Sequence, residues 1–450
     1  MKTRVINFKD IYRTLRFDGS FHNAEANIYD NVISQHSDHV LSFYCSEIFT
    51  SGRNKRVYTS KDYGYPFLSN SDVVAANPFM SCNYSSKKYG YDEKAVLKEG
   101  MILTGRVGAI GQTAFVPAYL EKEKAMGSDN IIRICVKPEF KNGFIYAYLA
   151  SRIGNLSFWK HATGGVQPFI TDIMVGELPI PNFSVEFQKE VDDLIKECSK
   201  LREEATYALK EAHKTFEKLF KLFSKQKTSR VSIQSIMTSH NKRFEASYYV
   251  SNNRSLIDHI INSGNYSLLN ELTSKIFKPN IFKREYVQKN GYQLIGGADM
   301  LKRIPTTDKM ISRRQVEKMP SLKLERNYIL ITRAGSIGNV AFVDNQIENL
   351  IISEDVLRVV PNDEKTAYYL YAFLSSTIGK KLITLFTYGS VIQHIESQHL
   401  ELVPIPNLKN EEYEKIVTLA CESIKKTEIA KAKEIKAIRM VEEEIEKWIN

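Results

Sequence analysis

The feature that most constrains the fold of this 450-residue chain is a long-range repeat. The segment 102–116 recurs as 329–343, and such self-similarity matters first because it defines the units that can fold. The matching residues are Arg106, Gly108, Ile110, Gly111, Ala114 and Phe115 in the first copy, and Arg333, Gly335, Ile337, Gly338, Ala341 and Phe342 in the second. The offset is 227 throughout, so the two segments align without a gap.

Further matches lie on both sides of this segment. The three clearest are Arg16-Phe17-Asp18 with Arg243-Phe244-Glu245, Ser128-Asp129-Asn130 with Ser353-Glu354-Asp355, and Pro179-Ile180-Pro181 with Pro404-Ile405-Pro406. The offsets stay between 225 and 228, and half of the chain length is 225. The sequence is therefore an internal duplication that spans the whole chain.

Each half ends in a segment typical of a long helix. Residues 184–224 contain no Pro or Gly, and their apolar residues alternate at spacings of four and three, which is a heptad seam. At ~1.5 Å per residue, roughly 40 residues give a rod of about 60 Å. A second segment, 411–450, has a seam interrupted by a Lys- and Ala-rich stretch, which indicates a stutter.

The predicted seam positions are Leu194, Leu201, Ala205, Ala208, Ala212 and Leu219 in the first helix, and Ile435, Ile438 and Ile445 in the second. The three alanines would let a partner backbone approach closely. Because only two such helices of matched length are evident, an antiparallel pair within the chain is the simplest pairing. An ordinary bundle would require further long amphipathic helices.

The regions before the helices have a different pattern. Short β-rich runs at 101–104, 114–116 and 131–136 lie among clusters of Gly, Asn, Ser and Asp, and 146–153 predicts a short helix. The predicted fold class is α+β, with two tandem mixed α/β domains, each followed by a spacer helix. The predicted segments are 1–182, the helix 183–226, 227–406 and the helix 407–450.

Charge and composition narrow the class of partner. The chain has 62 Lys+Arg against 52 Asp+Glu and an isoelectric point near 9.0, which favours an anionic partner such as nucleic acid. Its five cysteines form no C-x-x-C pair, which argues for a reducing compartment without disulfides or a thiolate zinc site. No signal peptide and no run of 18 apolar residues is evident, so we expect a cytoplasmic protein without a membrane segment.

No motif of the sequence matches a catalytic or metal-binding site in full. The glycines of Gly105-x-x-Gly108-x-x-Gly111 lack the Gly-Lys-Ser/Thr of a phosphate loop, and a strand-to-strand turn with positive φ explains them better. The 76–79 segment Ala-Asn-Pro-Phe lacks the second proline and the glycine-rich motif of an adenine methyltransferase. His394 and His399 have no further metal ligands nearby in the sequence. Carboxylates such as those at 129 and 354 are interpreted as turn or capping groups. We expect no catalytic residue, no metal and no cofactor in this chain.

Basic and Tyr-rich stretches recur at equivalent places in both halves, which favours DNA binding over solvated surface. The candidate DNA-binding residues of the first half are Arg53, Lys55, Arg56, Tyr58, Lys87, Lys88, Arg106, Lys160 and Gln167. Those of the second half are Lys278, Lys283, Arg284, Lys302, Arg303, Arg313, Arg314, Arg333 and Gln393. Lys and Arg neutralise phosphates, and Arg and Gln also read base edges.

The layout resembles the specificity subunit (HsdS) of type I restriction-modification systems. The resemblance rests on the duplicated order of domain and helix, the Arg-Phe-Asp/Glu motif, the Gly-Ala/Ser-Ile-Gly turn and the Pro-Ile-Pro exit, which together cover the full chain. It implies two target-recognition domains related by pseudo-two-fold symmetry and held apart by an antiparallel coiled coil. Each domain would read one half of a bipartite, asymmetric site on double-stranded DNA.

The resemblance also implies that catalysis belongs to partner subunits. Methyltransferase subunits would carry S-adenosylmethionine and methylate adenine, and restriction subunits would use ATP and Mg. Two alternatives remain open at this point. The first alternative is the specificity subunit of a type II-like or methylation-only system. The second is a non-enzymatic coiled-coil scaffold that binds proteins.

Overall fold

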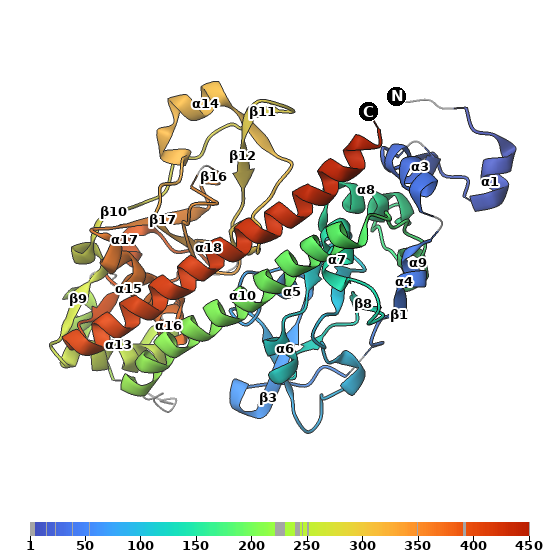
Figure 1. Ribbon diagram of the computed structural model, residues 1–450. Coiled ribbons are helices and arrows are strands. Elements are labelled where there is room, and N and C mark those ends of the chain that lie inside the picture. The colour runs from blue at the N-terminus through green and yellow to red at the C-terminus, as the bar shows by residue number, and fades with distance from the viewer. Residues whose placement is uncertain are drawn as a thin grey trace. The chain divides into compact units, whose positions relative to one another are not determined.

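The computed structural model describes residues 5–14, 16–22, 24–37, 39–53, 55–220, 230–238, 244, 246–249, 252–348, 350–389 and 393–449. The chain forms two compact units (Figure 1). Unit 1 comprises Met1–Glu203 and Ile429–Asn450, and unit 2 comprises Glu204–Glu428. Arg243 and Glu245 of the repeated Arg-Phe-Asp/Glu motif, and positions 221–226 of the predicted first spacer helix, lie outside the described residues.

Unit 1 contains two four-stranded sheets. The first has the order β1 (Cys45–Phe49), β8 (Ile131–Val136), β5 (Ile102–Gly105), β6 (Thr113–Phe115), and all its pairs are antiparallel. The second has the order β2 (Tyr58–Thr59), β4 (Asn83–Ser86), β3 (Gly64–Leu68), β7 (Met126–Gly127), and its β3–β7 pair is parallel. The predicted run 131–136 is thus a strand with the predicted bounds.

Unit 2 repeats both sheets. Its first sheet has the order β10 (Thr273–Phe277), β17 (Val356–Pro361), β14 (Ile329–Thr332), β15 (Val340–Phe342). Its second has the order β11 (Tyr286–Val287), β13 (Met310–Ser312), β12 (Gly291–Ile295), β16 (Ile351–Ile352), again with a parallel last pair. A small sheet joins β9 (Tyr266–Leu268) to β18 (Pro404–Pro406). Even the register irregularity in β1, between Cys45 and Glu47, recurs in β10 between Thr273 and Lys275.

Short helices complete each unit. Those of unit 1 are α1 (Phe8–Thr14), α2 (Gly19–His22), α3 (Ala26–His36), α4 (Leu41–Tyr44), η1 (Lys61–Tyr63), α5 (Asn70–Val73), η2 (Glu93–Ala95), α6 (Ala118–Lys122), α7 (Asn142–Ala150), α8 (Arg152–His161) and α9 (Asp172–Gly176). Those of unit 2 are α11 (Ile233–Thr238), α12 (Ala246–Tyr249), α13 (Asn252–Asn262), η3 (Leu269–Leu272), η4 (Asp299–Leu301), α14 (Arg313–Lys318), η5 (Pro320–Leu322), α15 (Glu364–Ser375), α16 (Thr377–Leu385) and α17 (Ser397–Leu400). The predicted helix at 146–153 is therefore two helices, α7 and α8, separated by Ser151.

Two of the repeated glycine positions are required for the same structural reason in both units. Gly108 and its counterpart Gly335 have φ of +74° and +70° in the β5–β6 and β14–β15 hairpins, which confirms the predicted turn with positive φ. At Gly154 an added Cβ would lie 2.3 Å from the Tyr148 carbonyl oxygen of the preceding helix. At Gly379 it would lie 2.2 Å from the Phe373 oxygen, so both helix pairs depend on a glycine for their close approach.

A fully buried arginine joins the two sheets of each unit. Arg133 on β8 donates from Nη2 to the Gly127 carbonyl of β7 at 2.7 Å, and from Nη1 to Ile131 at 2.9 Å. Arg358 on β17 donates from Nη2 to the Ile352 carbonyl of β16, also at 2.7 Å. Buried carbonyls need partners, so each guanidinium fixes the turn between the parallel strand of one sheet and a central strand of the other.

Two helices are much longer than the other helices that the structure describes. They are α10 (Val185–Leu219), green in Figure 1, and α18 (Asn410–Lys447), red in Figure 1. Each unit includes part of both helices, whereas the predicted segments treated the helices as separate from the domains. Within unit 1, Lys436 Nζ lies 4.0 Å from Glu190, and Lys433 Nζ lies 2.9 Å from Glu197. These two contacts run in opposite residue order, so the helices are antiparallel there.

Burial corrects two positions of the predicted seam. Leu219 is 38% exposed, and the buried residues at that end of α10 are Phe216 and Phe220, because the buried positions continue there at a spacing of four. Ile435 is 36% exposed, and Glu434 is buried at that level of α18. Of the other predicted positions, Ala205, Ala208, Ala212 and Ile445 are buried, and Leu194, Leu201 and Ile438 are partly buried.

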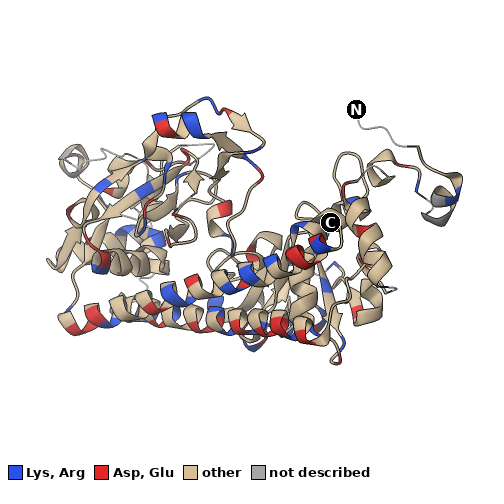
Figure 2. Ribbon diagram, turned by 45° about the horizontal axis from the view of Figure 1, so that its top comes forward, with Lys and Arg blue, Asp and Glu red and all other residues tan. Residues whose placement is uncertain are grey.

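The helices also carry buried charge, which the heptad rule does not predict. In unit 1, Glu434 accepts hydrogen bonds from Arg202 and from the Tyr146 hydroxyl. In unit 2, Glu428 accepts from the Asn345 backbone N–H at 3.1 Å and pairs with Arg326. Acidic and basic residues are interspersed along both helices (Figure 2). Among the described helices, none combines the length and the apolar character that crossing a bilayer requires.

Candidate nucleic-acid interface

The repeated hairpin places one arginine at the same backbone position in each unit. Arg106 follows β5, its N–H donates to the Asn130 carbonyl at 2.8 Å, and its own carbonyl accepts from Ile170 at 3.0 Å. Arg333 follows β14 and makes the equivalent backbone bonds to Asp355 at 3.3 Å and to Ile395 at 3.1 Å. We call Arg106 and Arg333 the hairpin arginines. Three chain segments therefore meet at each of them: the hairpin, the loop before β8 or β17, and the segment before α9 or α17.

The loop before β8 or β17 carries a repeated ion pair. Arg56 Nη2 lies 2.6 Å from Asp129, and Arg284 Nη2 lies 3.1 Å from both carboxylate oxygens of Glu354. The hydrogen bond to the carboxylate raises the pKa of each arginine. Both carboxylates, which the sequence predicts to be turn or capping groups, are partners of arginines about 70 residues away in sequence.

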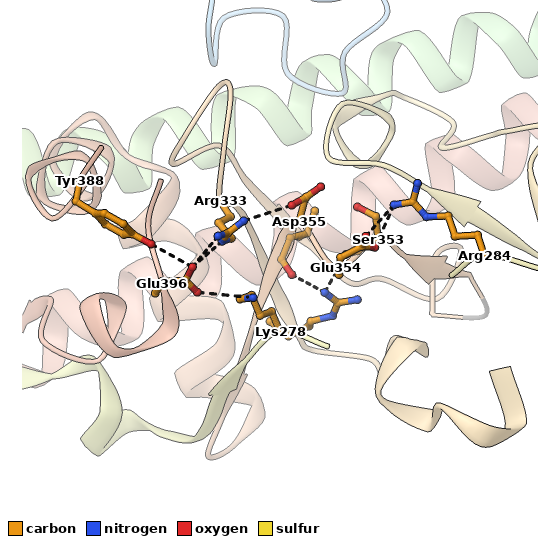
Figure 3. Close-up of polar contacts among 10 residues, drawn as sticks. Lys278, Arg284, Arg333, Ser353, Glu354, Asp355, Tyr388 and Glu396 are labelled. Carbon is orange, nitrogen blue, oxygen red and sulfur yellow. Dashed lines mark hydrogen bonds and ion pairs between the residues drawn. The ribbon is translucent and has the colours of Figure 1, made fainter. Parts of the chain in front are cut away.

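In unit 2 the hairpin arginine is held by acidic side chains (Figure 3). The Nη2 of Arg333 lies 2.7 Å from Glu396 Oε1, its Nε lies 3.0 Å from the same oxygen, and its Nη1 lies 3.4 Å from Asp355. The Tyr388 hydroxyl donates to Glu396 at 3.2 Å, and Lys278 Nζ lies 3.9 Å from the other oxygen. Glu396 is thus the centre of a four-residue contact set.

The charge state of this set follows from the contacts. Burial by itself would raise the pKa of Glu396, but the hydrogen bonds and charge of Arg333 outweigh burial and hold the pKa below its usual value. Burial likewise opposes the charge on Arg333, and Glu396 more than offsets it, so the pKa of Arg333 is raised. Both groups are therefore charged at neutral pH.

The same place in unit 1 has no such acid. Position 396 corresponds to Thr171, whose Oγ1 accepts from the Met174 N–H at 3.3 Å as the N-cap of α9. Asp355 corresponds to Asn130, and Lys278 to Thr50. In the part of the chain that the structure describes, no carboxylate lies within ion-pair distance of the Arg106 guanidinium, which is partly exposed.

Five further candidates of unit 1 lie in or next to β2 and β4 in the sequence. Arg53 and Lys55 are exposed in the segment before β2, and Tyr58 on β2 is 49% exposed. Lys87 donates to the Asp62 carbonyl at 3.1 Å and lies over the Tyr65 ring, and Lys88 lies over Tyr89.

Lys160 and the two candidate glutamines differ in whether the side chain is exposed to a DNA partner. Lys160 Nζ lies 2.6 Å from Asp30, and only 10% of its side chain is exposed, so it is engaged in an internal ion pair. Gln167 and Gln393 are exposed. Each lies in a loop closed by paired backbone bonds, between Thr163 and Phe169 in unit 1 and between Tyr388 and His394 in unit 2.

The remaining candidates of unit 2 lie around its second sheet. Lys283 is exposed beside Arg284, and the neighbouring pair Arg313 and Arg314 is exposed at the start of α14. Lys302 is paired with Asp299 at 2.7 Å, and Arg303 is partly buried. Basic segments are visible on this part of the ribbon in Figure 2.

Sequence reasoning missed Glu396, which organises the hairpin arginine of unit 2. Residues shared by the two repeats do not include it, because the first repeat has Thr171 at that place. A signal existed for the Arg56–Asp129 and Arg284–Glu354 pairs, since both members recur at nearly constant offsets. Among the described residues, no group of three or more His, Cys, Asp or Glu side chains is placed to hold a metal ion.

The two units thus present an arginine after the first hairpin strand and an arginine–carboxylate ion pair at equivalent positions. Residues 265–439 match the family model described as the type I restriction modification DNA specificity domain. The resemblance drawn from the repeated motifs is thereby confirmed, and the second half of the chain carries that domain. Comparison with curated proteins gave no match.

Two solved structures are similar to this chain at low sequence identity. The S subunit of a type I restriction-modification system from M. genitalium is 11% identical over 91% of this chain and 94% of that chain, with a TM-score of 0.32. The HsdS subunit from Thermoanaerobacter tengcongensis is 17% identical over 91% and 95%, with a TM-score of 0.26.

Proposed function

We propose that this chain is the DNA specificity subunit of a type I restriction-modification complex and that each unit reads one half of a bipartite, asymmetric sequence. The observation that carries the proposal is the match of residues 265–439 to the DNA specificity domain. The proposal extends to the whole chain because unit 1 repeats the strand order, the buried arginine and the hairpin of unit 2. The loops around the hairpins differ, as two different half-sites require.

The long helices act as the spacer in this proposal. Half-sites about one helical turn apart, ~34 Å, present the same face of the duplex. A rod of about 60 Å is long enough to set such a distance. The antiparallel contacts of α10 and α18 within unit 1 support an antiparallel coiled coil, and that direction suits two repeats related by a pseudo-two-fold axis.

The chemistry belongs to partner subunits in this proposal. Methyltransferase subunits supply S-adenosylmethionine and methylate adenine, and restriction subunits supply ATP- and Mg-dependent cleavage. The role of this chain is to bind double-stranded DNA and to position those subunits on it. Its basic, partly exposed arginines and exposed glutamines are the side-chain types that contact phosphates and base edges.

The test is to identify the DNA sequence that the chain selects. The full chain is co-expressed with a type I methyltransferase subunit, and methylated adenines are mapped in the DNA of the producing cells. The expected result is a split motif with a fixed gap, absent when the methyltransferase subunit is expressed alone. Methylation at a continuous motif, or a pattern identical to that control, would overturn the proposal.

A further inference from the structure

The two units share a backbone but differ in the charge around the hairpin arginine. In unit 2, Lys278 and Arg333 face Glu396 and Asp355, so two positive and two negative groups balance. In unit 1 the positions of Lys278, Asp355 and Glu396 hold Thr50, Asn130 and Thr171, and only the arginine is charged. The same structural position is therefore cationic in unit 1 and neutral in unit 2.

The contact that neutralises Arg333 has the geometry of a phosphate contact. Two of its guanidinium nitrogens lie 2.7 and 3.0 Å from one carboxylate oxygen of Glu396, as they would from a phosphate oxygen. The side chains of Arg333 and Glu396 remain 19% and 23% exposed. Because partly exposed ion pairs contribute only about 0–1 kcal/mol, an incoming phosphate can replace the carboxylate.

We infer that Glu396 is an internal competitor for the DNA backbone: Arg106 binds a phosphate directly, whereas Arg333 binds one only after Glu396 has been displaced. The inference rests on the proposed function and adds an asymmetry to it. Unit 1 gains affinity from its hairpin arginine on any duplex. Unit 2 gains it only where other contacts hold the DNA close enough to displace Glu396, so its hairpin arginine contributes selectively.

The first experiment measures the affinity of the full chain for a fluorescent duplex of mixed sequence across a salt titration. Each phosphate contact adds ~0.9 to the slope of log affinity against log salt. Glu396→Gln frees Arg333 without changing the size of the side chain. We expect it to bind several-fold more tightly than the wild type, with a slope steeper by ~0.9. Arg333→Gln combined with Glu396→Gln should abolish the gain.

The reciprocal experiment installs the competitor in unit 1. Thr171→Glu places a carboxylate at the position of Glu396, and Thr171→Gln is its matched control, because both variants lose the hydroxyl that caps α9. We expect Thr171→Glu to weaken binding several-fold and to lower the slope by ~0.9, relative to Thr171→Gln. In an Arg106→Gln background the two variants should bind alike.

The outcomes separate this inference from the proposed function. If the wild-type chain shows no salt-dependent binding of duplex DNA, both are overturned. Only the competitor role is overturned if the wild type binds DNA, Glu396→Gln binds like the wild type, and Thr171→Glu binds like Thr171→Gln. Weaker binding by Glu396→Gln would also overturn it, because Glu396 would then contact DNA itself. Unchanged thermal unfolding of each variant excludes loss of fold as the cause.

Discussion

At the residue scale, the clearest structural requirement is the buried arginine of each unit. Burial lowers the pKa of Arg133 to about 10 and of Arg358 to about 9, and neither makes an ion pair in the part of the chain that the structure describes. Their charge is stabilised by backbone carbonyls instead, at Gly127 and Ile131 in unit 1 and at Ile352 and Ser353 in unit 2.

Replacement of Arg358 by Met should therefore destabilise unit 2. The variant leaves buried carbonyls of the 352–356 turn without donors, at a cost on the order of 2–3 kcal/mol. Arg133→Met should cost a similar amount in unit 1, because the geometry repeats. Urea denaturation measures both, with Arg314→Met on the surface of α14 as the control. Equal stability of Arg358→Met and Arg314→Met would show that the guanidinium does not join the sheets.

A second residue-scale prediction concerns His161 in unit 1. Burial lowers its pKa to about 4; Lys160 and Arg16 act in the same direction, and Asp30 opposes them. An unfolded chain binds this proton with a pKa near 6.5. Between about pH 6.5 and 4 the unfolded state therefore holds a proton that the folded state excludes. The contribution of His161 to stability is fully present above that window and is lost as the pH falls through it.

The measurement is the free energy of unfolding of the wild type and of His161→Asn from pH 7 to pH 5. The wild type should lose stability more steeply, by about 1.4 kcal/mol per pH unit at most. Because all other histidines are common to both proteins, the difference isolates this side chain. Parallel pH profiles would contradict the prediction.

At the element scale, the sequence pattern predicts the two long helices but only part of their buried faces. Their existence and approximate bounds could be predicted, because 35 and 38 residues without a helix breaker leave few alternatives. The buried face could not be predicted fully, because the heptad rule assigns charged residues to solvent. Glu434 is 2% exposed beside Arg202 at 6%, while the nearby Ile435 is 36% exposed. A charge can be buried where its partner is buried with it.

The Arg202–Glu434 pair gives the element-scale prediction. Burial would lower the pKa of Arg202, and the charge of Glu434 more than offsets it, so the pKa is raised above its usual value. Arg202→Met removes the positive charge that faces the buried Glu434 carboxylate and should cost about 3–5 kcal/mol. Arg202→Met with Glu434→Gln removes both charges, keeps an acceptor for Tyr146, and should recover most of the loss.

The control is a more exposed ion pair of the same helices. Lys433→Met removes the contact of Lys433 with Glu197, whose side chain is 56% exposed, and should cost less than ~1 kcal/mol. All variants are compared by urea denaturation. If the double variant is no more stable than Arg202→Met alone, the buried charge is not the source of the cost.

At the scale of the whole molecule, duplication made the fold predictable where the two copies agree. The hairpin glycines and the hairpin arginines follow from residues that the two copies share, whereas the strand 131–136 follows from its own β-rich composition. The second sheet of each unit was not found, because β2 and β11 have two residues each and lack an alternating pattern. Glu396 was missed for the opposite reason: function in a duplicated chain depends partly on what differs between the copies.

The last prediction concerns the helix pair as a spacer. Ala208 on α10 is 7% exposed in unit 2, and α10 and α18 lie close enough there for the Ser423 hydroxyl to donate to the Ala205 carbonyl at 2.7 Å. Ala208→Leu adds volume to this packed position, at a cost of about 1–3 kcal/mol, and should push the helices apart. The selected DNA motif should then keep both half-sites and change its gap, or tolerate more than one gap.

The matched control is Tyr207→Leu, because Tyr207 is 37% exposed on the adjacent position of the same helix. Both variants are co-expressed with the methyltransferase subunit, and methylated sites are mapped as for the wild type. If Ala208→Leu selects the same half-sites with the same gap, the packing of the helices at Ala208 does not set the half-site spacing. If the half-site bases change and the gap does not, Ala208 acts on base reading within unit 2. The helices would then not set the spacing of the half-sites.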